Sequence, residues 1–212
     1  MKRAIFAAAL AVCSASPLLA QEKAAPAPPS LPAGWQLRLD KETADPSKVS
    51  FAVMEPGFHA TTGPAAILWK PTDNMKGDFR VTAKFHQMKA PTHPEAYGIF
   101  VAGKNLERAD QEYGYIVIRG DGKYLIKHRA GTELHTVADW TDAASLKKQD
   151  EAGKATNTVT VEVSGGFVKF LLNGTEVQRL DAKEHSPVGL VGLRINHNLD
   201  VHISEFTVTP IK

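Results

Sequence analysis

The chain has 212 residues, of which 25 are Lys or Arg, 23 are Asp or Glu, and 43% are hydrophobic. This length is sufficient for one domain with a full hydrophobic core. Two of the basic residues, Lys2 and Arg3, lie in a leader that we expect to be removed, which leaves 23 basic against 23 acidic residues. No nucleic-acid partner is expected, because binding to a phosphate backbone requires a clear excess of basic residues.

The first 20 residues have the pattern of a secretory signal peptide. A short basic start is followed by an apolar run from Ala4 to Val12 and by the small residue Ala20. The run is too short to be a permanent membrane span. The single cysteine, Cys13, follows the bulky Val12, which disfavours lipoprotein anchoring at this position. The sequence therefore predicts an exported protein, periplasmic or extracellular, that contains no cysteine and no membrane span after cleavage.

The next segment, residues 21–32, is rich in Ala and Pro and has no apolar periodicity. Such a composition is typical of an extended linker. Residues 33–212 are then expected to form a single domain.

Apolar and polar residues alternate in several short segments of this domain. The clearest segments are 79–86, 158–163 and 167–172, and alternation places each apolar set on one side of a β-sheet. Gly-containing turns at 164–166 and 173–174 separate the later strands. Helical signals are nearly absent. The sequence predicts an all-β, two-sheet antiparallel sandwich or jelly roll.

The hairpin over residues 113–129 is expected to turn at Gly120-Asp121-Gly122. A three-residue turn puts Ile116 and Ile118 on one face with Tyr124 and Ile126, so that this face enters the core. A two-residue turn would shift the partner strand by one residue and mix apolar with polar side chains. The opposite face then carries a polar and aromatic set, which comprises Tyr115, Arg119, Lys123, Lys127 and Arg129.

The C-terminal part reads as a strand over 188–195, a turn over 196–198 and a final strand over 200–208. Phe206 and Val208 have the opposite parity to Val201 and Ile203. We therefore expect a β-bulge near residues 204–205 that returns them to the core.

This order of elements resembles the concanavalin A-like lectin/glucanase superfamily. More narrowly, it is similar to the laminin-G-like and 3-keto-disaccharide-hydrolase-like jelly rolls of exported bacterial proteins. The segments that carry the resemblance are 77–81, 97–100, 113–124, 157–161, 170–174, 191–193 and 205–208. The resemblance implies the jelly-roll fold, and it leaves the activity open among sugar binders, glycan hydrolases and other members.

The acidic motif of the glucanase branch, Glu-x-Asp-x-x-Glu, does not occur. Asp40-Lys41-Glu42 lacks the third acid, and the acids between Glu107 and Glu112 lie in a predicted loop. Retaining glucanase chemistry is therefore disfavoured, and no catalytic residue can be named. None of the eight histidines forms a short metal-binding motif, so neither a metal nor a cofactor is expected.

Two functions remain. The first is a non-catalytic module that binds a carbohydrate or a glycosylated surface. The alternative is a glycoside or keto-sugar hydrolase or lyase that acts on a small saccharide, and a structural or adhesion domain is also compatible with the fold. The sequence does not decide which sugar, if any, is bound, or the oligomeric state.

The predicted ligand site is one polar sheet face with a turn at its rim. Long cations on strands of a nearly neutral protein suit an acidic or hydroxyl-rich ligand, which Arg holds through paired hydrogen bonds. The competing interpretation is that these cations pair with acids such as Glu162 or Asp200 and merely cover the sheet. The predicted site residues are Tyr115, Arg119, Lys127 and Arg194 on the face, with Asn196 and His197 at the rim.

Overall fold

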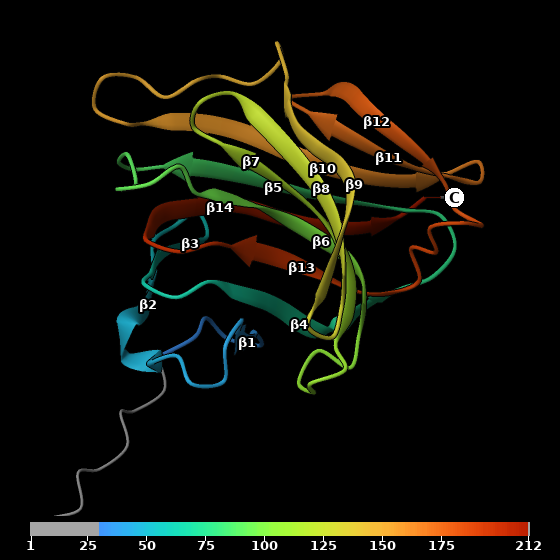
Figure 1. Ribbon diagram of the computed structural model, residues 1–212, viewed down its shortest axis with the longest axis horizontal. Coiled ribbons are helices and arrows are strands. Elements are labelled where there is room, and N and C mark those ends of the chain that lie inside the picture. The colour runs from blue at the N-terminus through green and yellow to red at the C-terminus, as the bar shows by residue number, and fades with distance from the viewer. Residues whose placement is uncertain (1–29, 212) are drawn as a thin grey trace, which may run out of the picture.

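The computed structural model describes residues 30–211, and these form two antiparallel sheets packed face to face (Figure 1). Sheet A has seven strands in the order β1-β4-β13-β6-β7-β8-β9, and sheet B has seven in the order β12-β11-β10-β5-β14-β3-β2. The predicted two-sheet antiparallel sandwich is confirmed. The predicted signal peptide and most of the predicted linker lie outside the described residues.

The strands of sheet A are β1 (Gln36–Leu39), β4 (Ala66–Met75), β13 (Gly189–Ile195), β6 (Ala96–Lys104), β7 (Glu112–Arg119), β8 (Lys123–Ala130) and β9 (Glu133–Asp142). Those of sheet B are β12 (Thr175–Asp181), β11 (Phe167–Leu172), β10 (Ala155–Ser164), β5 (Phe79–Gln87), β14 (Leu199–Pro210), β3 (Phe58–Thr62) and β2 (Val49–Val53). One short 3-10 helix, η1 (Pro46–Lys48), precedes β2.

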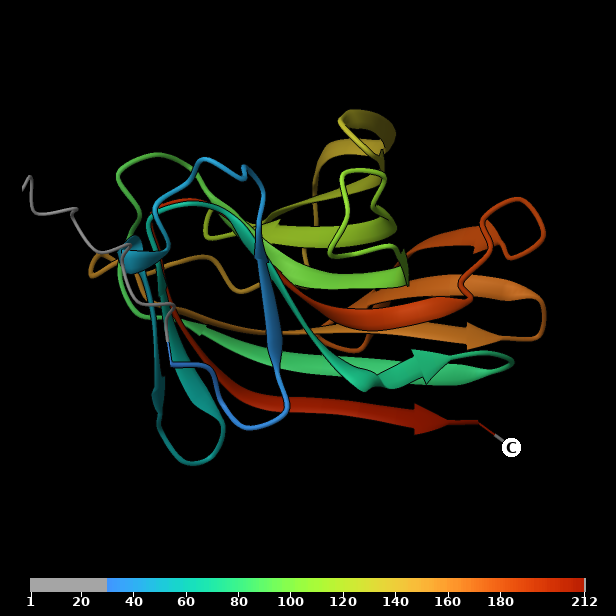
Figure 2. The ribbon, with the colours of Figure 1, turned by 90° about the horizontal axis from the view of Figure 1, so that it is seen from below.

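The main core lies between the two sheets, which Figure 2 shows as separate layers. Alternation in β5 and β10 buries every second residue, as predicted. Val81 is the register partner of Val161, and these side chains lie next to each other on the inner face of sheet B. The inner face of sheet A contributes Ile99, Ile116 and other aliphatic side chains. Burial of these apolar faces provides the main driving force for the fold.

The β7–β8 hairpin turns through residues 120–122, as expected from the sequence. The register pairs Ile118 with Tyr124 and Ile116 with Ile126, and all four side chains enter the main core. Gly122 has a φ of 88° and donates its backbone N–H to the carbonyl of Arg119 at 3.1 Å. A glycine suits this position because side chains disfavour positive φ.

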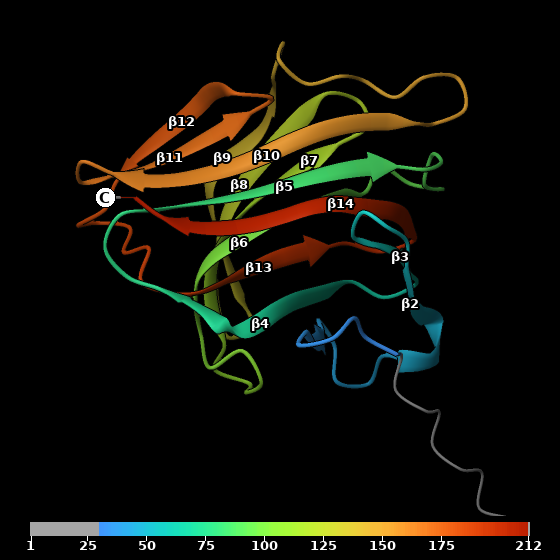
Figure 3. The same cartoon turned by 180° about the vertical axis from the view of Figure 1, so that it is seen from behind.

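The C-terminal prediction is also confirmed. The chain turns after β13, with Asn198 at a φ of 51°, and it passes from sheet A into sheet B. The pairing of β14 with β5 shifts register between Ile203 and Glu205. Beyond this bulge Phe206 and Val208 pack partly buried against the core. Figure 3 shows β14 between β5 and β3 on the sheet B side.

Candidate functional site

The side chains of sheet A that point away from sheet B form a second, smaller apolar cluster. We call this surface the outer face of sheet A. It carries aromatic and aliphatic side chains that are 7% exposed or less, with Trp140 packed partly buried against them. They are Ile67, Trp69, Ala96, Phe100, Leu106, Tyr113, Tyr115, Val117 and Leu125. Burial on both faces of one sheet requires a further layer of chain, and part of this face has one.

Arg194 lies on the outer face, as its parity predicted, but it is only 5% exposed. Its guanidinium donates two hydrogen bonds to Asp40, at 2.9 and 2.7 Å, and a third to the Tyr113 hydroxyl at 2.9 Å. It also lies over the Tyr115 ring, 4.9 Å from the centroid. A second arginine, Arg129, approaches Asp40 at 3.4 Å. The carboxylate of Asp40 thus joins two buried cations.

These contacts shift the protonation equilibria of the group. Burial opposes ionisation of Asp40, but the hydrogen bonds and charge of Arg194, together with the charge of Arg129, outweigh it and hold the pKa of Asp40 below its ordinary value. Burial disfavours the charged form of Arg194, yet the hydrogen bonds to Asp40 raise its pKa. Burial raises the pKa of the Tyr113 hydroxyl. The group is a compensated ion cluster at neutral pH.

The loop of residues 105–111 covers part of the outer apolar cluster of sheet A. Figure 2 shows the connection between β6 and β7 on the outer side of sheet A. Leu106 is 3% exposed within the outer apolar cluster, and Arg38 donates hydrogen bonds to the carbonyls of Leu106 and Arg108 at 3.1 and 2.5 Å. We call this region, comprising Asp40, Tyr113, Tyr115, Arg129 and Arg194, the closed half of the outer face.

The competing interpretation named Glu162 and Asp200 as partners of the cations, and for Arg194 both of these acids were wrong. Arg194 pairs with Asp40 rather than with Glu162 or Asp200. Those two acids lie on sheet B, where Glu162 contacts Arg80 and Lys169, and Asp200 contacts His59 and Lys89. The prediction missed Asp40 because it lies 154 residues away from Arg194 in the chain.

The remaining strands β7 to β9 carry a more accessible region, the open half, which comprises Arg119, Lys127, Thr136 and Trp140. The Arg119 guanidinium lies 4.2 Å from the Trp140 ring centroid and is also paired with Asp121 at the hairpin turn. Lys127 is half-buried, and within residues 30–211 it has no carboxylate at ion-pair distance. Thr136 is its exposed register partner on β9.

Asn196 and His197 lie at one end of sheet A, beside the strand end that carries Arg119. Ala96 is the register partner of Arg119, and its carbonyl accepts a hydrogen bond from the Asn196 backbone at 3.0 Å. His197 is exposed, with Nδ1 3.8 Å from Glu95. The six predicted residues therefore divide into a buried pair, Tyr115 and Arg194, and a more accessible set of four.

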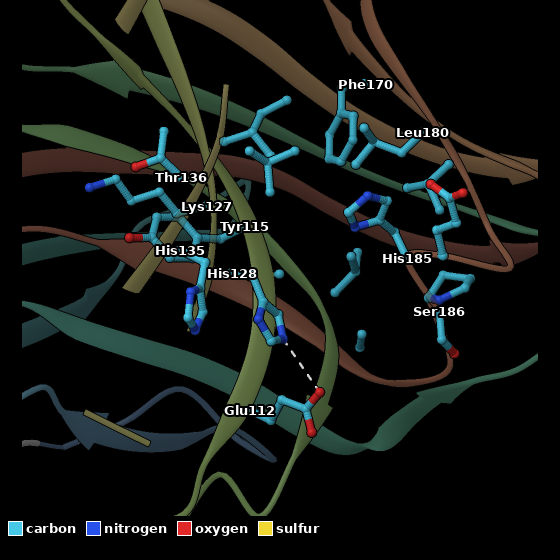
Figure 4. Close-up of a pocket in the computed structure, with 18 of the residues that line it drawn as sticks. Glu112, Tyr115, Lys127, His128, His135, Thr136, Phe170, Leu180, His185 and Ser186 are labelled. Carbon is cyan, nitrogen blue, oxygen red and sulfur yellow. Dashed lines mark ion pairs between the residues drawn. The ribbon is translucent and has the colours of Figure 1, made fainter. Parts of the chain in front are cut away.

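A pocket of about 700 Å³ opens between the two sheets beside β8 and β9 (Figure 4). Its sheet A side includes His128 and His135, and its sheet B side includes Phe170 and Leu180. Tyr115 and Lys127 also border the pocket, but in Figure 4 their side chains extend away from the side where Phe170 and His185 lie. This agrees with their place on the outer face.

No motif in the sequence marks this pocket. The only available signal was parity, because His128 shares the core-facing side of β8 with Ile126. The position of β11 and β12 opposite that side follows from sheet-to-sheet packing, which the sequence pattern does not encode.

Within residues 30–211, no group of three or more His, Cys, Asp or Glu side chains is arranged to hold a metal ion. No helix there has the length and apolar character needed to cross a membrane.

Comparisons with known proteins show which solved structures share this fold. No protein-family model matches the sequence, and no curated protein matches it. A carbohydrate-binding module of the CBM66 type from Bacillus subtilis superposes with a TM-score of 0.59 at 12% identity, covering 83% of this chain and 95% of the module. A Bacillus subtilis protein of unknown function with a galectin-like fold gives 0.58 at 15% identity, covering 83% and 89%. The exoplasmic/lumenal domain of VIP36, in a form bound to Ca2+ and Man3GlcNAc, gives 0.58 at 9% identity and 84% of each chain.

These likenesses define a class of fold. The chain has a concanavalin A-like jelly-roll fold, which it shares with carbohydrate-binding modules and lectin domains. The jelly-roll fold that the sequence resemblance implied is confirmed. At these identities the comparisons describe the architecture, and the function has to be argued from the side chains.

Proposed function

We propose that the protein is an exported carbohydrate-recognition module that binds a glycan on the outer face of sheet A. The observation that carries this proposal is the open half. The Trp140 ring is partly exposed on the sheet, and the planar guanidinium of Arg119 lies over it, 4.2 Å from the ring centroid. Sugar recognition uses such flat apolar surfaces for C–H groups and planar polar groups for hydroxyls. The fold that the chain shares with the carbohydrate-binding module and with the VIP36 domain bound to Man3GlcNAc supports the same proposal.

The roles of the six predicted residues follow from their positions. Arg119 and Lys127 are placed to contact the ligand directly, and Asn196 and His197 would meet a glycan that extends past Arg119 to the end of the sheet. Tyr115 and Arg194 would act from beneath, because their buried contacts fix the strands that carry the open half. Export itself is proposed from the signal-peptide pattern at residues 1–20.

A glycan array probed with the chain lacking residues 1–20 tests this function. We expect a saturable glycan ligand whose affinity falls in Trp140→Ala and Arg119→Ala, while the melting temperature stays within a few degrees of the parent. Incubation of the best glycan with the protein, followed by product analysis, separates binding from turnover. Unchanged affinity in both variants would remove the open half as the site, and product formation would favour the hydrolase or lyase alternative.

A further inference from the structure

The pocket between the sheets is distinct from the proposed glycan site, and only Tyr115, Lys127 and Thr136 border both. It opens toward the inner faces of the sheets, whereas Arg119 and Trp140 lie on the outer face of sheet A. Its volume of about 700 Å³ falls within the range of roughly 300–1,000 Å³ that is usual for small-molecule sites.

The walls of the pocket are aliphatic and aromatic and come from both sheets. Sheet A contributes Val101, Ile126 and Val137, and sheet B contributes Val168, Phe170 and Leu180. All six belong to the main core or pack directly against it. A ligand that enters between them meets the apolar interior of the sandwich, which favours hydrocarbon over a hydroxyl-rich ring.

The mouth of the pocket is polar, and it carries more cationic and imidazole groups than free carboxylates. On sheet A the rings of His128 and His135 stack with centroids 6.0 Å apart. The Glu112 carboxylate is already shared between His128, at 3.3 Å, and Lys104, at 3.6 Å. His135 has Glu133 within 3.5 Å, outside the lining of the pocket.

The opposite rim is the loop of residues 182–188, where His185 and Ser186 lie toward the pocket (Figure 4). Within residues 30–211, His185 has no carboxylate at ion-pair distance. The second acid of the lining, Glu184, is exposed on the same loop. Imidazole and ammonium donors therefore outnumber the carboxylates that remain available to accept from them, which suits an anionic head group.

We propose that the pocket binds a small amphipathic anion, a medium-chain fatty acid or a molecule of that class. The hydrocarbon chain lies between Phe170 and Leu180 on one side and Ile126 on the other. The carboxylate stays at the mouth, where His185 donates to it from one side and the Nδ1–H of a protonated His128, whose Nε2 pairs with Glu112, donates from the other. The ligand differs in chemistry from the proposed glycan, and the site shares only the border residues Tyr115, Lys127 and Thr136 with the outer face of sheet A.

The affinity should follow the length of the chain. Isothermal titration of the whole protein with octanoate, decanoate and dodecanoate should show one saturable site. Each added methylene should tighten binding about fourfold until the pocket is filled. Decanol, which has the chain of decanoate without its charge, should bind about tenfold more weakly.

A bulky residue at the rim tests the location without disturbing the core. Ser186 is exposed on the rim loop, so Ser186→Trp should obstruct entry and weaken decanoate binding at least tenfold. The matched control is Ser50→Trp, because Ser50 is exposed on β2, at the far edge of sheet B from β12. A second variant, His185→Gln, should weaken decanoate and leave decanol unchanged.

The two sites can be separated in the same titrations. Trp140→Ala should leave decanoate binding intact, and Ser186→Trp should leave glycan binding intact. If none of the three acids shows saturable binding, the proposal is overturned. Equal decanoate affinity in Ser186→Trp and Ser50→Trp would do so as well, whatever the glycan results show.

Discussion

The closed and open halves of the outer face contain the same kinds of side chain, yet they differ in what those side chains can do. In the closed half Arg194 lies over Tyr115, and in the open half Arg119 lies over Trp140. The difference is that Arg194 is buried and donates two hydrogen bonds to the partly buried Asp40, whereas Arg119 pairs with the exposed Asp121 and Trp140 remains partly exposed. An arginine beside an aromatic ring therefore indicates a binding surface only where no buried carboxylate already occupies it and no loop covers it.

The largest expected effect concerns the closed half. Asp40→Ala leaves Arg194 buried without its partner and removes the acid that Arg129 approaches. Loss of one member of a buried ion pair costs about 3–5 kcal/mol of unfolding free energy. Chemical denaturation should show this loss, whereas Asp142→Ala at the end of β9, beside the open half, should cost less than about 1 kcal/mol, because its contact with Lys123 is exposed.

The same experiment has a stricter form. Replacing both partners, as in Asp40→Leu with Arg194→Met, should recover part of the stability, because it removes the unpaired charge of Arg194 and leaves only Arg129 without the carboxylate of Asp40. A double variant as unstable as Asp40→Ala would mean that the pair does more than compensate charge. A small effect of Asp40→Ala would show that the closed half tolerates a free cation and is less closed than its geometry indicates.

The second prediction concerns glycan affinity in the open half. Trp140→Ala removes the flat apolar surface and should weaken binding of the best glycan about 10- to 100-fold. The matched control is Phe167→Ala on sheet B, since Phe167 is also exposed and has Arg179 5.2 Å from its ring. Titration should give parent-like affinity for this control. If Trp140→Ala and Phe167→Ala bind the glycan equally well, the pair of Trp140 and Arg119 on sheet A has no role in glycan binding.

Much of the fold could be predicted because strands encode burial in alternation. The three-residue turn between β7 and β8, the turn at Asn198 and the bulge after Ile203 all followed from parity or from residues that favour turns. Such features depend on neighbours in the sequence. Parity also placed Arg194, Arg119 and Lys127 correctly on one face.

The environment of that face could not be predicted. Asp40 reaches Arg194 only because β1 and β13 both flank β4, and strand order is not visible in a single sequence. The loop around Leu106 is rich in charge and reads as solvated, but one apolar side chain buries it against the sheet. The predicted site residues are therefore a mixture of structural and accessible groups, and the sequence pattern alone cannot separate them.

The third prediction concerns the effect of low pH on the stability of the closed half. Because the folded state holds the pKa of Asp40 below its unfolded value, its contribution to stability is complete above that unfolded value of 3.8. The contribution is lost as the pH falls through the lower pKa of the folded state. The difference in unfolding free energy between the parent and the Asp40→Leu, Arg194→Met variant should therefore shift in favour of the variant below about pH 4.

Other acids that titrate in this range are common to both proteins and cancel in the difference. Glu162 is one, since hydrogen bonds from Arg80, Ser164 and Lys169 lower its pKa to about 2. Denaturant titrations at several pH values between 2 and 6 measure the difference directly. If the difference in unfolding free energy stays constant over this pH range, ionisation of Asp40 does not stabilise the fold.

The smallest expected effect concerns Lys127, the accessible cation of the open half that has no acidic partner within the described residues. A flexible, half-exposed ammonium contributes less than about 1 kcal/mol to a contact in water, so Lys127→Gln should weaken glycan binding about two- to fivefold. Lys84→Gln is the control, because Lys84 is also half-buried on a strand but belongs to sheet B. Raising the salt concentration should reduce the difference between the parent and Lys127→Gln, since screening removes the contribution that the substitution removes. Equal effects of the two lysine variants, or a difference that persists in high salt, would place the charged part of the ligand away from Lys127 and leave Arg119 as the cation that contacts it.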